Sequence, residues 1–251
     1  MKLLVDIGNT RIKWARCDGG RLSPPQSVAH RDLDLSTVLD DGWGGIERPR
    51  AVWIASVLGT ERQRAVAEWM IRRWDLQPRF VTSQAEQLGV RNGYRDPSRL
   101  GVDRWVALLA ARARFHEPVC VVDFGSALTI DAIDGSGNHL GGLIVPGLRT
   151  MHRSLTGGDI NLDAGTPETT AIAEAMGRDT AEAVGYGIRR CLAHFVDGVC
   201  GDVERKLGEA TQRVITGGDA EQLKPLLRGR YHHVAELVLE GLALIAEEDG
   251  A

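Results

Sequence analysis

The sequence predicts an α/β protein made of two lobes of similar design. One short phrase occurs twice, as Asp6-Ile-Gly-Asn-Thr10 and as Asp123-Phe-Gly-Ser-Ala127, each time between an apolar run and an alternating run. Predicted strands and helices are also interspersed along the chain, which is the pattern of the α/β class. A chain of 251 residues can form one large domain or two lobes, and the duplicated phrase favours two.

The first lobe is expected to span residues 1–116 and to begin with a hairpin over residues 1–15. An apolar run, an acidic-glycine turn and an alternating run are typical of two antiparallel strands with a tight connection. Apolar spacing and turn residues then predict a short helix at 33–39, a buried strand at 51–57, a helix at 61–74, a brief strand at 80–81, a loop at 89–97 and a helix at 100–115.

The second lobe is expected to span residues 117–251, because Glu117-Pro118 interrupts the pattern. This lobe begins with the hairpin that contains the second copy of the phrase. The predicted elements after it are a strand at 139–145, a helix at 148–155, a polar loop to 169, helices at 170–176 and 179–199, a strand at 214–216, and helices at 220–227 and 234–247. The final helix either stays with this lobe or packs back on the first one.

Composition excludes several classes of protein. The net charge of −4 and a pI near 6.0 lack the basic footprint of a nucleic-acid binder. Four cysteines without CxxC or zinc spacing favour a reducing compartment. No apolar stretch approaches 18 residues, and only three apolar residues separate Lys2 from Asp6, so neither a membrane span nor a signal-peptide core is expected. The sequence predicts a cytoplasmic protein without nucleic-acid or membrane partners.

The first turn has the residues that a phosphate site needs. A carboxylate such as Asp6 at the end of a buried strand is unfavourable unless it is paired or ligated. Gly8 lets a ligand approach the backbone, and Asn9, Thr10 and Lys13 add polar groups. A purely structural hairpin is the alternative, and the second copy of the phrase favours phosphate contact. The order strand-turn-strand, without GxxxxGK[ST], is not that of a Walker loop.

The second turn carries Asp123, Gly125 and Ser126, whose hard oxygen atoms suit magnesium or an alkali cation better than zinc or copper. Later in the chain, Gly217 and Gly218 follow an apolar strand and precede a predicted helix. Their backbone either lies against an adenosine or forms only a tight turn between strand and helix.

Asp103 lies in the first turn of the helix predicted at 100–115. Most acidic residues at this position simply interact favourably with the helix dipole. Here, however, a loop containing Tyr94, Asp96 and Pro97 leads directly into the helix. A carboxylate beside a substrate hydroxyl can accept its proton during phosphoryl transfer, so Asp103 is a candidate general base.

Taken together, these segments resemble the type III pantothenate kinases, members of the acetate kinase, sugar kinase, Hsp70 and actin superfamily. The resemblance runs nearly end to end. It rests on Asp6-x-Gly-Asn-Thr-x-x-Lys13, Tyr94 with Leu100-Gly-Val-Asp-Arg-Trp105, Asp123-x-Gly-Ser-Ala-x-Thr-x-Asp131, Gly141-Gly142 with Pro146-Gly147, Gly177-Arg-Asp-Thr180 and Thr216-Gly-Gly-Asp219. Ser126 is the main departure, because many relatives have Thr there, but the hydroxyl is retained.

The resemblance implies two ribonuclease H-like lobes, with mixed sheets flanked by helices and ATP in the cleft between them. It implies transfer of the γ-phosphoryl group of ATP to pantothenate, giving 4'-phosphopantothenate in the first step of coenzyme A biosynthesis. It also implies a homodimer in which the partner subunit helps to close the pantothenate pocket.

The resemblance further implies a role for each matching residue. Asp103 would be the proton acceptor. Asp6 would help to place Mg²⁺, directly or through water, and Asp123 would bind a monovalent cation, K⁺ or NH₄⁺. The implied ATP and phosphate contacts are Asp6, Gly8, Asn9, Thr10, Lys13, Gly125, Ser126, Gly217 and Gly218. The implied pantothenate contacts are Tyr94, Gly101, Val102, Asp103, Arg104 and Thr180.

Two other functions stay open at this stage. Some close relatives are described as accessory factors for transcription regulators, so the chain could be a binding protein. A kinase for another small alcohol, such as a sugar, would share the cleft but should lack the residues from Tyr94 to Arg104. The presence of Asp6, Lys13, Asp103 and Asp123 argues against a decayed site.

Overall fold

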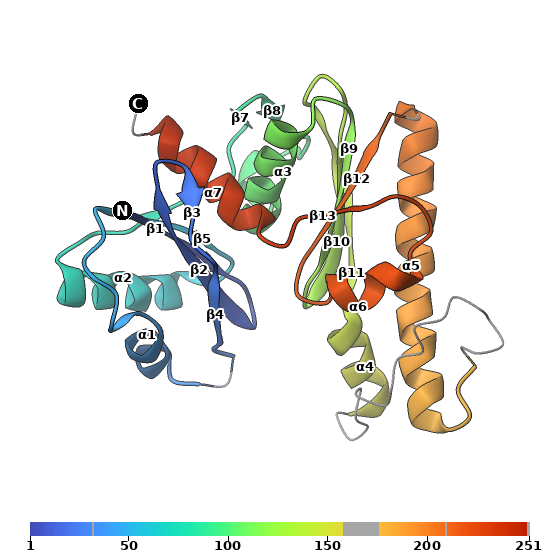
Figure 1. Ribbon diagram of the computed structural model, residues 1–251, viewed down its shortest axis with the longest axis horizontal. Helices are drawn as coiled ribbons and strands as arrows, with labels where there is room; N and C mark the ends of the chain where they lie inside the picture. The colour runs from blue at the N-terminus through green and yellow to red at the C-terminus, as the bar shows by residue number, and fades with distance from the viewer. Residues whose placement is uncertain (32, 158–175, 209, 250–251) are drawn as a thin grey trace. The chain divides into compact units, whose positions relative to one another are not determined.

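The computed structural model describes residues 1–31, 33–157, 176–208 and 210–249, and the chain divides into two α/β units (Figure 1). The first unit comprises Met1–Arg114 and the returning segment Glu236–Ala251, and the second comprises Phe115–Ala235. The sequence had suggested a division at 116/117. The predicted α/β class with two lobes is confirmed.

The first unit is built on a six-stranded mixed sheet of order β3-β2-β1-β5-β6, with β4 paired to β2. The predicted first hairpin is confirmed, because Val5 lies opposite Trp14 in antiparallel register. A separate two-stranded ribbon joins β7 and β8. The strands are β1 (Lys2–Ile7), β2 (Arg11–Asp18), β3 (Arg21–Leu22), β4 (Gln26–Ala29), β5 (Ala51–Ser56), β6 (Arg79–Phe80), β7 (Glu86–Gln87) and β8 (Val90–Arg91).

Helices cover both faces of this sheet, which explains why β1 is a continuous apolar run. Helices α1 (Leu35–Trp43) and α2 (Thr60–Trp74) pack on one face, and α3 (Val102–Arg114) and α7 (Leu237–Glu248) on the other (Figure 1). The short 3₁₀ helix η1 (Pro97–Arg99) leads into α3. Four tryptophans form the centre of the first face, with ring centroids of neighbouring pairs 5.1–6.4 Å apart: Trp14, Trp43, Trp69 and Trp74.

The second unit repeats the strand plan of the first. Its five-stranded sheet has the order β11-β10-β9-β12-β13, in which β9 is antiparallel to β10 and parallel to β12. In the first unit, β1 is likewise antiparallel to β2 and parallel to β5. The duplicated phrase therefore marks a duplicated topology. The strands are β9 (Val119–Phe124), β10 (Ala127–Ile133), β11 (His139–Pro146), β12 (Gln212–Thr216) and β13 (His232–His233).

Helices α4 (Leu148–Thr156), α5 (Thr180–Leu207) and α6 (Ala220–Leu223) accompany this sheet, followed by the 3₁₀ helix η3 (Lys224–Leu226). Helix α5 begins where it does because the Asp179 carboxylate accepts a hydrogen bond from the N–H of Glu182. Its apolar stripe, Ile188, Leu192 and Val196, is buried in a core shared with residues of β9 and β10.

Several boundaries differ from the sequence-based expectation. Helix α5 continues to Leu207 rather than ending at 199, and α7 begins at Leu237 rather than 234. The helix expected at 220–227 is divided into α6 and η3 at Pro225, because proline lacks the N–H that an α-helix needs there. Of the two-residue strands, β6 overlaps the brief strand predicted at 80–81. β3, β7, β8 and β13 were missed, since they are too short to show alternation. The helix predicted at 170–176, except its last residue, and most of the loop before it lie outside the described residues.

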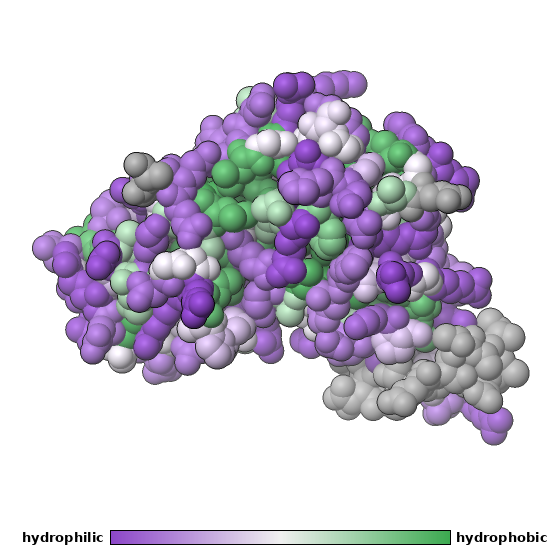
Figure 2. Space-filling view, turned by 45° about the horizontal axis from the view of Figure 1, so that its top comes forward, coloured by the Kyte–Doolittle hydropathy of each residue, from purple (hydrophilic) through white to green (hydrophobic). Residues whose placement is uncertain are grey.

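Figure 2 shows hydrophilic residues over most of the face in view. No helix within the described ranges is long and apolar enough to cross a membrane.

Candidate active site

The turn between β1 and β2, with the adjoining ends of the two strands, holds the five residues predicted for phosphate contact in the first unit. The N–H of Gly8 donates to the carbonyl of Arg11 at 3.0 Å, which closes the turn. Asp6 near the end of β1 lies opposite Lys13 on β2 in the antiparallel register. Asn9 at the tip is exposed, whereas Gly8 and Thr10 are half-buried. The end of β1 and the start of β2 therefore group a carboxylate, an ammonium group and the amides of the turn.

Lys13 has an acidic neighbour that the sequence did not indicate. Its Nζ lies 3.3 Å from Oε2 of Glu236, and both side chains are about one-quarter exposed. Glu236 immediately precedes α7, so the contact joins two segments of the first unit that are distant in sequence. No local pattern could have predicted this pair.

The first turn of α3 brings together the predicted residues around Asp103. Oδ1 of Asp103 accepts a hydrogen bond of 2.8 Å from the N–H of Arg104. The buried Arg104 guanidinium donates to the hydroxyl of Tyr94 at 2.8 Å, with its central carbon 5.5 Å from the Tyr94 ring centroid. A Cβ on Gly101 would come within 2.8 Å of Asp103 Oδ1, so glycine leaves room for the carboxylate.

Asn92 is a further residue of this region, and its position in the sequence predicts only a loop. Its buried side chain donates to the carbonyls of Gln84 and Pro97, each at 3.1 Å, and accepts from the N–H of Tyr94 at 3.0 Å. A buried amide with three such bonds fixes the path of the loop. Asn92 therefore positions Tyr94 beside Arg104.

In the second unit, the turn between β9 and β10 lies against the turn that follows β12. Thr216 pairs with Asp123 in the parallel register, and the N–H of Asp219 donates to the carbonyl of Phe124 at 3.0 Å. Gly217 has φ = +95°, and a Cβ there would overlap Asp123 Oδ1 and the Phe124 backbone. The predicted segments around Asp123 and Gly217 thus form one group, and Gly217-Gly218 does form the turn into α6.

The start of α4 completes this group. The N–H of Gly147 donates to the carbonyl of Ser126 at 3.0 Å, and the Thr150 hydroxyl donates to the same oxygen at 2.6 Å. A Cβ on Gly147 would overlap the Gly125 carbonyl, so the helix start requires glycine to lie this close. The exposed Ser126 is therefore held through its backbone by two groups of α4.

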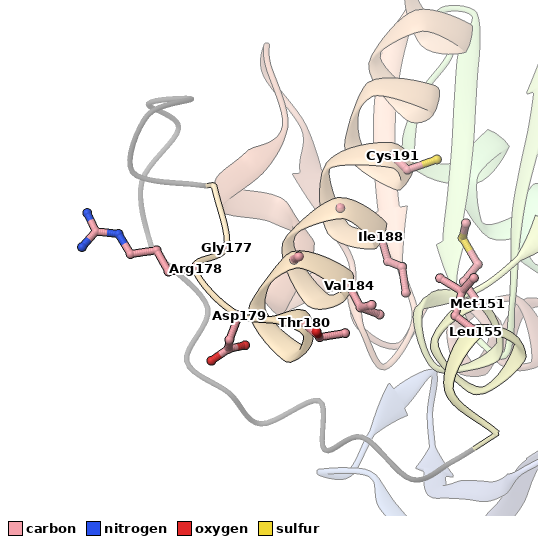
Figure 3. Close-up of a pocket in the computed structure, with 11 residues that line it drawn as sticks. Met151, Leu155, Gly177, Arg178, Asp179, Thr180, Val184, Ile188 and Cys191 are labelled. Carbon is pink, nitrogen blue, oxygen red and sulfur yellow. The ribbon is translucent and has the colours of Figure 1, made fainter.

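Thr180 is the first residue of α5. It borders a cavity of about 760 Å³ within the second unit. Figure 3 shows Val184 and Ile188 of α5 directed toward Met151 and Leu155 of α4, so this side of the cavity is apolar. Thr180 belongs to the second unit and Asp103 to the first, so neither unit by itself brings these two predicted pantothenate contacts together.

The residues fit a cation that accompanies a nucleotide better than a cation held by the protein alone. In the described part of the chain, no group of three or more His, Cys, Asp or Glu side chains is placed to hold a metal ion. Mg²⁺ in kinase sites usually has one or two carboxylates, with phosphate oxygens and water completing its coordination. Single carboxylates such as Asp6 and Asp123 suit that arrangement.

The two α/β units share one sheet plan, and each has an acidic-glycine turn after its central strand. These features define a protein of the acetate kinase, sugar kinase, Hsp70 and actin fold. Solved structures agree on this fold. One is a Campylobacter jejuni protein assigned to the Baf family of transcriptional activators (TM-score 0.59, 21% identity, 99% of this chain and 98% of that chain). Another is a ROK family glucokinase from Streptomyces griseus in complex with glucose and AMPPNP (TM-score 0.53, 15% identity, 98% and 99%).

Sequence comparison specifies the family. The profile of the type III pantothenate kinases matches residues 2–202. The type III pantothenate kinase of Nitrosococcus oceani is 38% identical over 255 residues, covering 99% of this chain and 94% of the relative. The chain belongs to the type III pantothenate kinase family, which confirms the resemblance found in the sequence.

Proposed function

We propose that the protein phosphorylates pantothenate with ATP, forming 4'-phosphopantothenate and ADP. Membership of the type III pantothenate kinase family along nearly the whole chain carries this proposal. The cluster of Asp103, Arg104 and Tyr94 supports it, because it places a carboxylate, a buried guanidinium and a phenol next to one another.

The two turns are proposed to contact ATP, one from each unit. Transfer of a phosphoryl group mainly requires alignment of the reactants and compensation of the charge on the phosphoryl oxygens. In the first unit the Asp6–Lys13 turn supplies amides and an ammonium group. In the second unit, the proposed contacts are Gly125, Ser126, Gly217 and Gly218, and the glycines leave backbone accessible to a nucleotide.

Asp103 is proposed as the general base. The Arg104 N–H holds one oxygen of its carboxylate, and this sets the direction of the group. The carboxylate accepts the proton of the terminal hydroxyl of pantothenate as that oxygen attacks the γ-phosphorus of ATP, and ADP leaves. Gly101, Val102 and Arg104, with Tyr94 and Thr180, are proposed to line the pantothenate pocket.

The proposed reaction also involves bound cations. Bound Mg²⁺ and a monovalent cation, K⁺ or NH₄⁺, would supply positive charge to the phosphate oxygens. Asp6 is proposed to help hold Mg²⁺ and Asp123 the monovalent cation, in keeping with their hard oxygen donors. A cytoplasmic location stays a prediction from the sequence.

We also propose that the protein works as a homodimer. Several large apolar side chains of the second unit are exposed in the single chain, among them Ile144 at 60% and Leu155 at 68%. Association with a second copy of the chain would remove such exposed apolar side chains from water. Ile144→Glu and Leu155→Glu are expected to shift the mass in solution toward the monomer. An unchanged dimer in both variants would exclude these side chains from the interface, and a monomeric wild type would refute the dimer.

A coupled assay of ADP release tests the proposed reaction. Pantothenate, common sugars and no acceptor are compared in the presence of Mg²⁺ and K⁺, with 4'-phosphopantothenate identified by mass spectrometry. ADP release that depends on pantothenate alone supports the proposal. Turnover with sugars would indicate a kinase for another alcohol, and no turnover with any acceptor would favour an accessory binding protein.

A further inference from the structure

His30 is a fully buried histidine that directly follows the edge strand β4. Because β4 pairs with β2, with Ala29 opposite Arg11, His30 is placed next to the β1–β2 turn. Its backbone N–H donates to the carbonyl of Thr10 at 3.0 Å. Its ring Nε2 lies 2.8 Å from the carbonyl oxygen of Gly8. One residue therefore binds two carbonyls of the phosphate turn.

The partners of the ring determine its tautomer. A carbonyl oxygen only accepts, so Nε2 carries the hydrogen and donates to Gly8. Nδ1 faces the guanidinium of Arg62 on α2 at 3.4 Å, and because arginine only donates, Nδ1 accepts. Both ring nitrogens are thus satisfied inside the fold, as buried polar groups usually are.

These bonds set the direction of the turn amides. No peptide bond between described residues is cis, and in a trans peptide the C=O and N–H point in opposite directions. With the Gly8 carbonyl directed at the His30 ring, the N–H of Asn9, an exposed residue, points away from that ring. Glycine imposes few restrictions on its own dihedral angles, so the Gly8–Asn9 peptide could rotate if this bond were absent.

We propose that His30 is a positioning residue that holds the first turn in its nucleotide-binding conformation, with Arg62 fixing its ring. This inference rests on the proposed function, in which the turn contacts the phosphates of ATP. It predicts an effect on ATP that is separate from any effect on pantothenate.

The test compares four variants with the wild type. His30→Ala removes the donor to Gly8, whereas His30→Gln keeps an N–H donor for Gly8 and an acceptor for Arg62. Arg62→Met removes only the partner of Nδ1. Trp69→Phe is the control, because it removes another largely buried donor of the same unit, the indole N–H bound to Asp40 at 2.7 Å, away from the turn. KM for ATP, KM for pantothenate, kcat and thermal stability are measured for each.

His30→Ala is expected to raise KM for ATP by about threefold to tenfold, the range for one net hydrogen bond, with KM for pantothenate within about twofold. His30→Gln should recover most of this loss, and Arg62→Met should show a smaller rise in KM for ATP. Trp69→Phe should lower stability without changing KM for ATP. An unchanged KM for ATP in folded His30→Ala, no recovery in His30→Gln, or an equal rise in Trp69→Phe would overturn the inference.

Failure of the proposed function is distinguishable from failure of this inference. If the wild type does not phosphorylate pantothenate, the proposed function fails, and His30 is then tested by calorimetric titration with a non-hydrolysable ATP analogue. Weaker binding of the analogue by His30→Ala, recovered in His30→Gln, supports the positioning role. Equal binding by His30→Ala and the wild type refutes it.

If His30→Ala does not fold, the test depends on Arg62→Met and His30→Gln. A rise in KM for ATP in Arg62→Met, without a rise in His30→Gln, supports the positioning role. An unchanged KM for ATP in Arg62→Met refutes it.

Discussion

Lys13 and Glu236 form an ion pair in the first unit, with Nζ and Oε2 3.3 Å apart. The chain leaves the second unit at Ala235, and Glu236 is the first residue of the segment that returns to the first unit. Glu236, the acidic partner of Lys13, is therefore located where the chain re-enters the first unit. ATP phosphates and Glu236 would compete for the same ammonium group.

Glu236→Gln is expected to lower KM for ATP by about twofold to fivefold, the range for a partly exposed ion pair, because Lys13 loses a competing anion. Lys13→Met should raise KM for ATP. The control is Glu240→Gln in α7, which removes the carboxylate that accepts two hydrogen bonds from Arg114 of α3. Steady-state kinetics at varied ATP provide the measurement, and an unchanged KM in Glu236→Gln would show that the pair does not affect ATP binding.

Asp103→Asn should reduce kcat by about 10²-fold or more, the usual scale for loss of a general base, with KM for ATP nearly unchanged. The amide oxygen of asparagine can still accept from the Arg104 N–H, so the local fold is expected to persist. Asp96→Asn is the matched control, since Asp96 caps the helix η1 close by and has no proposed catalytic role. Near-normal turnover of Asp103→Asn would remove this residue from the proton-transfer step.

Gly217→Ala should destabilise the second unit and weaken ATP binding. Alanine at φ = +95° is strained, a penalty of about 1–3 kcal/mol, and its Cβ would also displace Asp123. Gly218→Ala is the control for stability, because a Cβ at Gly218 meets nothing within 4 Å. Urea denaturation is compared for both variants, and KM for ATP is compared between Gly217→Ala and the wild type. Equal stability of the two would contradict the close contact between Gly217 and the Asp123 turn.

Three cysteines should be protected from thiol reagents while the protein is folded. Cys17, Cys120 and Cys200 are buried, and the Sγ atoms of the last two lie 3.4 Å apart. The hydrogen bond to Cys200, together with burial, raises the pKa of the Cys120 thiol well above its ordinary value, which suppresses the reactive thiolate. A Cys191→Ser variant is labelled with a thiol reagent at pH 8 and analysed by mass spectrometry. The folded protein should form no rapid adduct, whereas the protein in denaturant should form three adducts. Rapid native labelling of Cys120 or Cys200 would contradict the packing of β9 on α5.

Much of this protein could be predicted from its sequence because the relevant patterns are local. The two turns, the first turn of α3 and the Gly217-Gly218 turn each place their chemical groups within about ten residues of one another. Apolar periodicity over a similar length specifies the longer strands and helices. The family resemblance depends on the same short segments, so it too was visible without a structure.

Tertiary structure alone decided which distant groups lie next to these turns. Glu236 beside Lys13 and His30 beside Gly8 leave no periodic signal in the sequence. Such partners arise when helices and strands pack and each buried polar group must find a donor or acceptor. Local patterns determine which elements form, whereas packing determines which side chains meet.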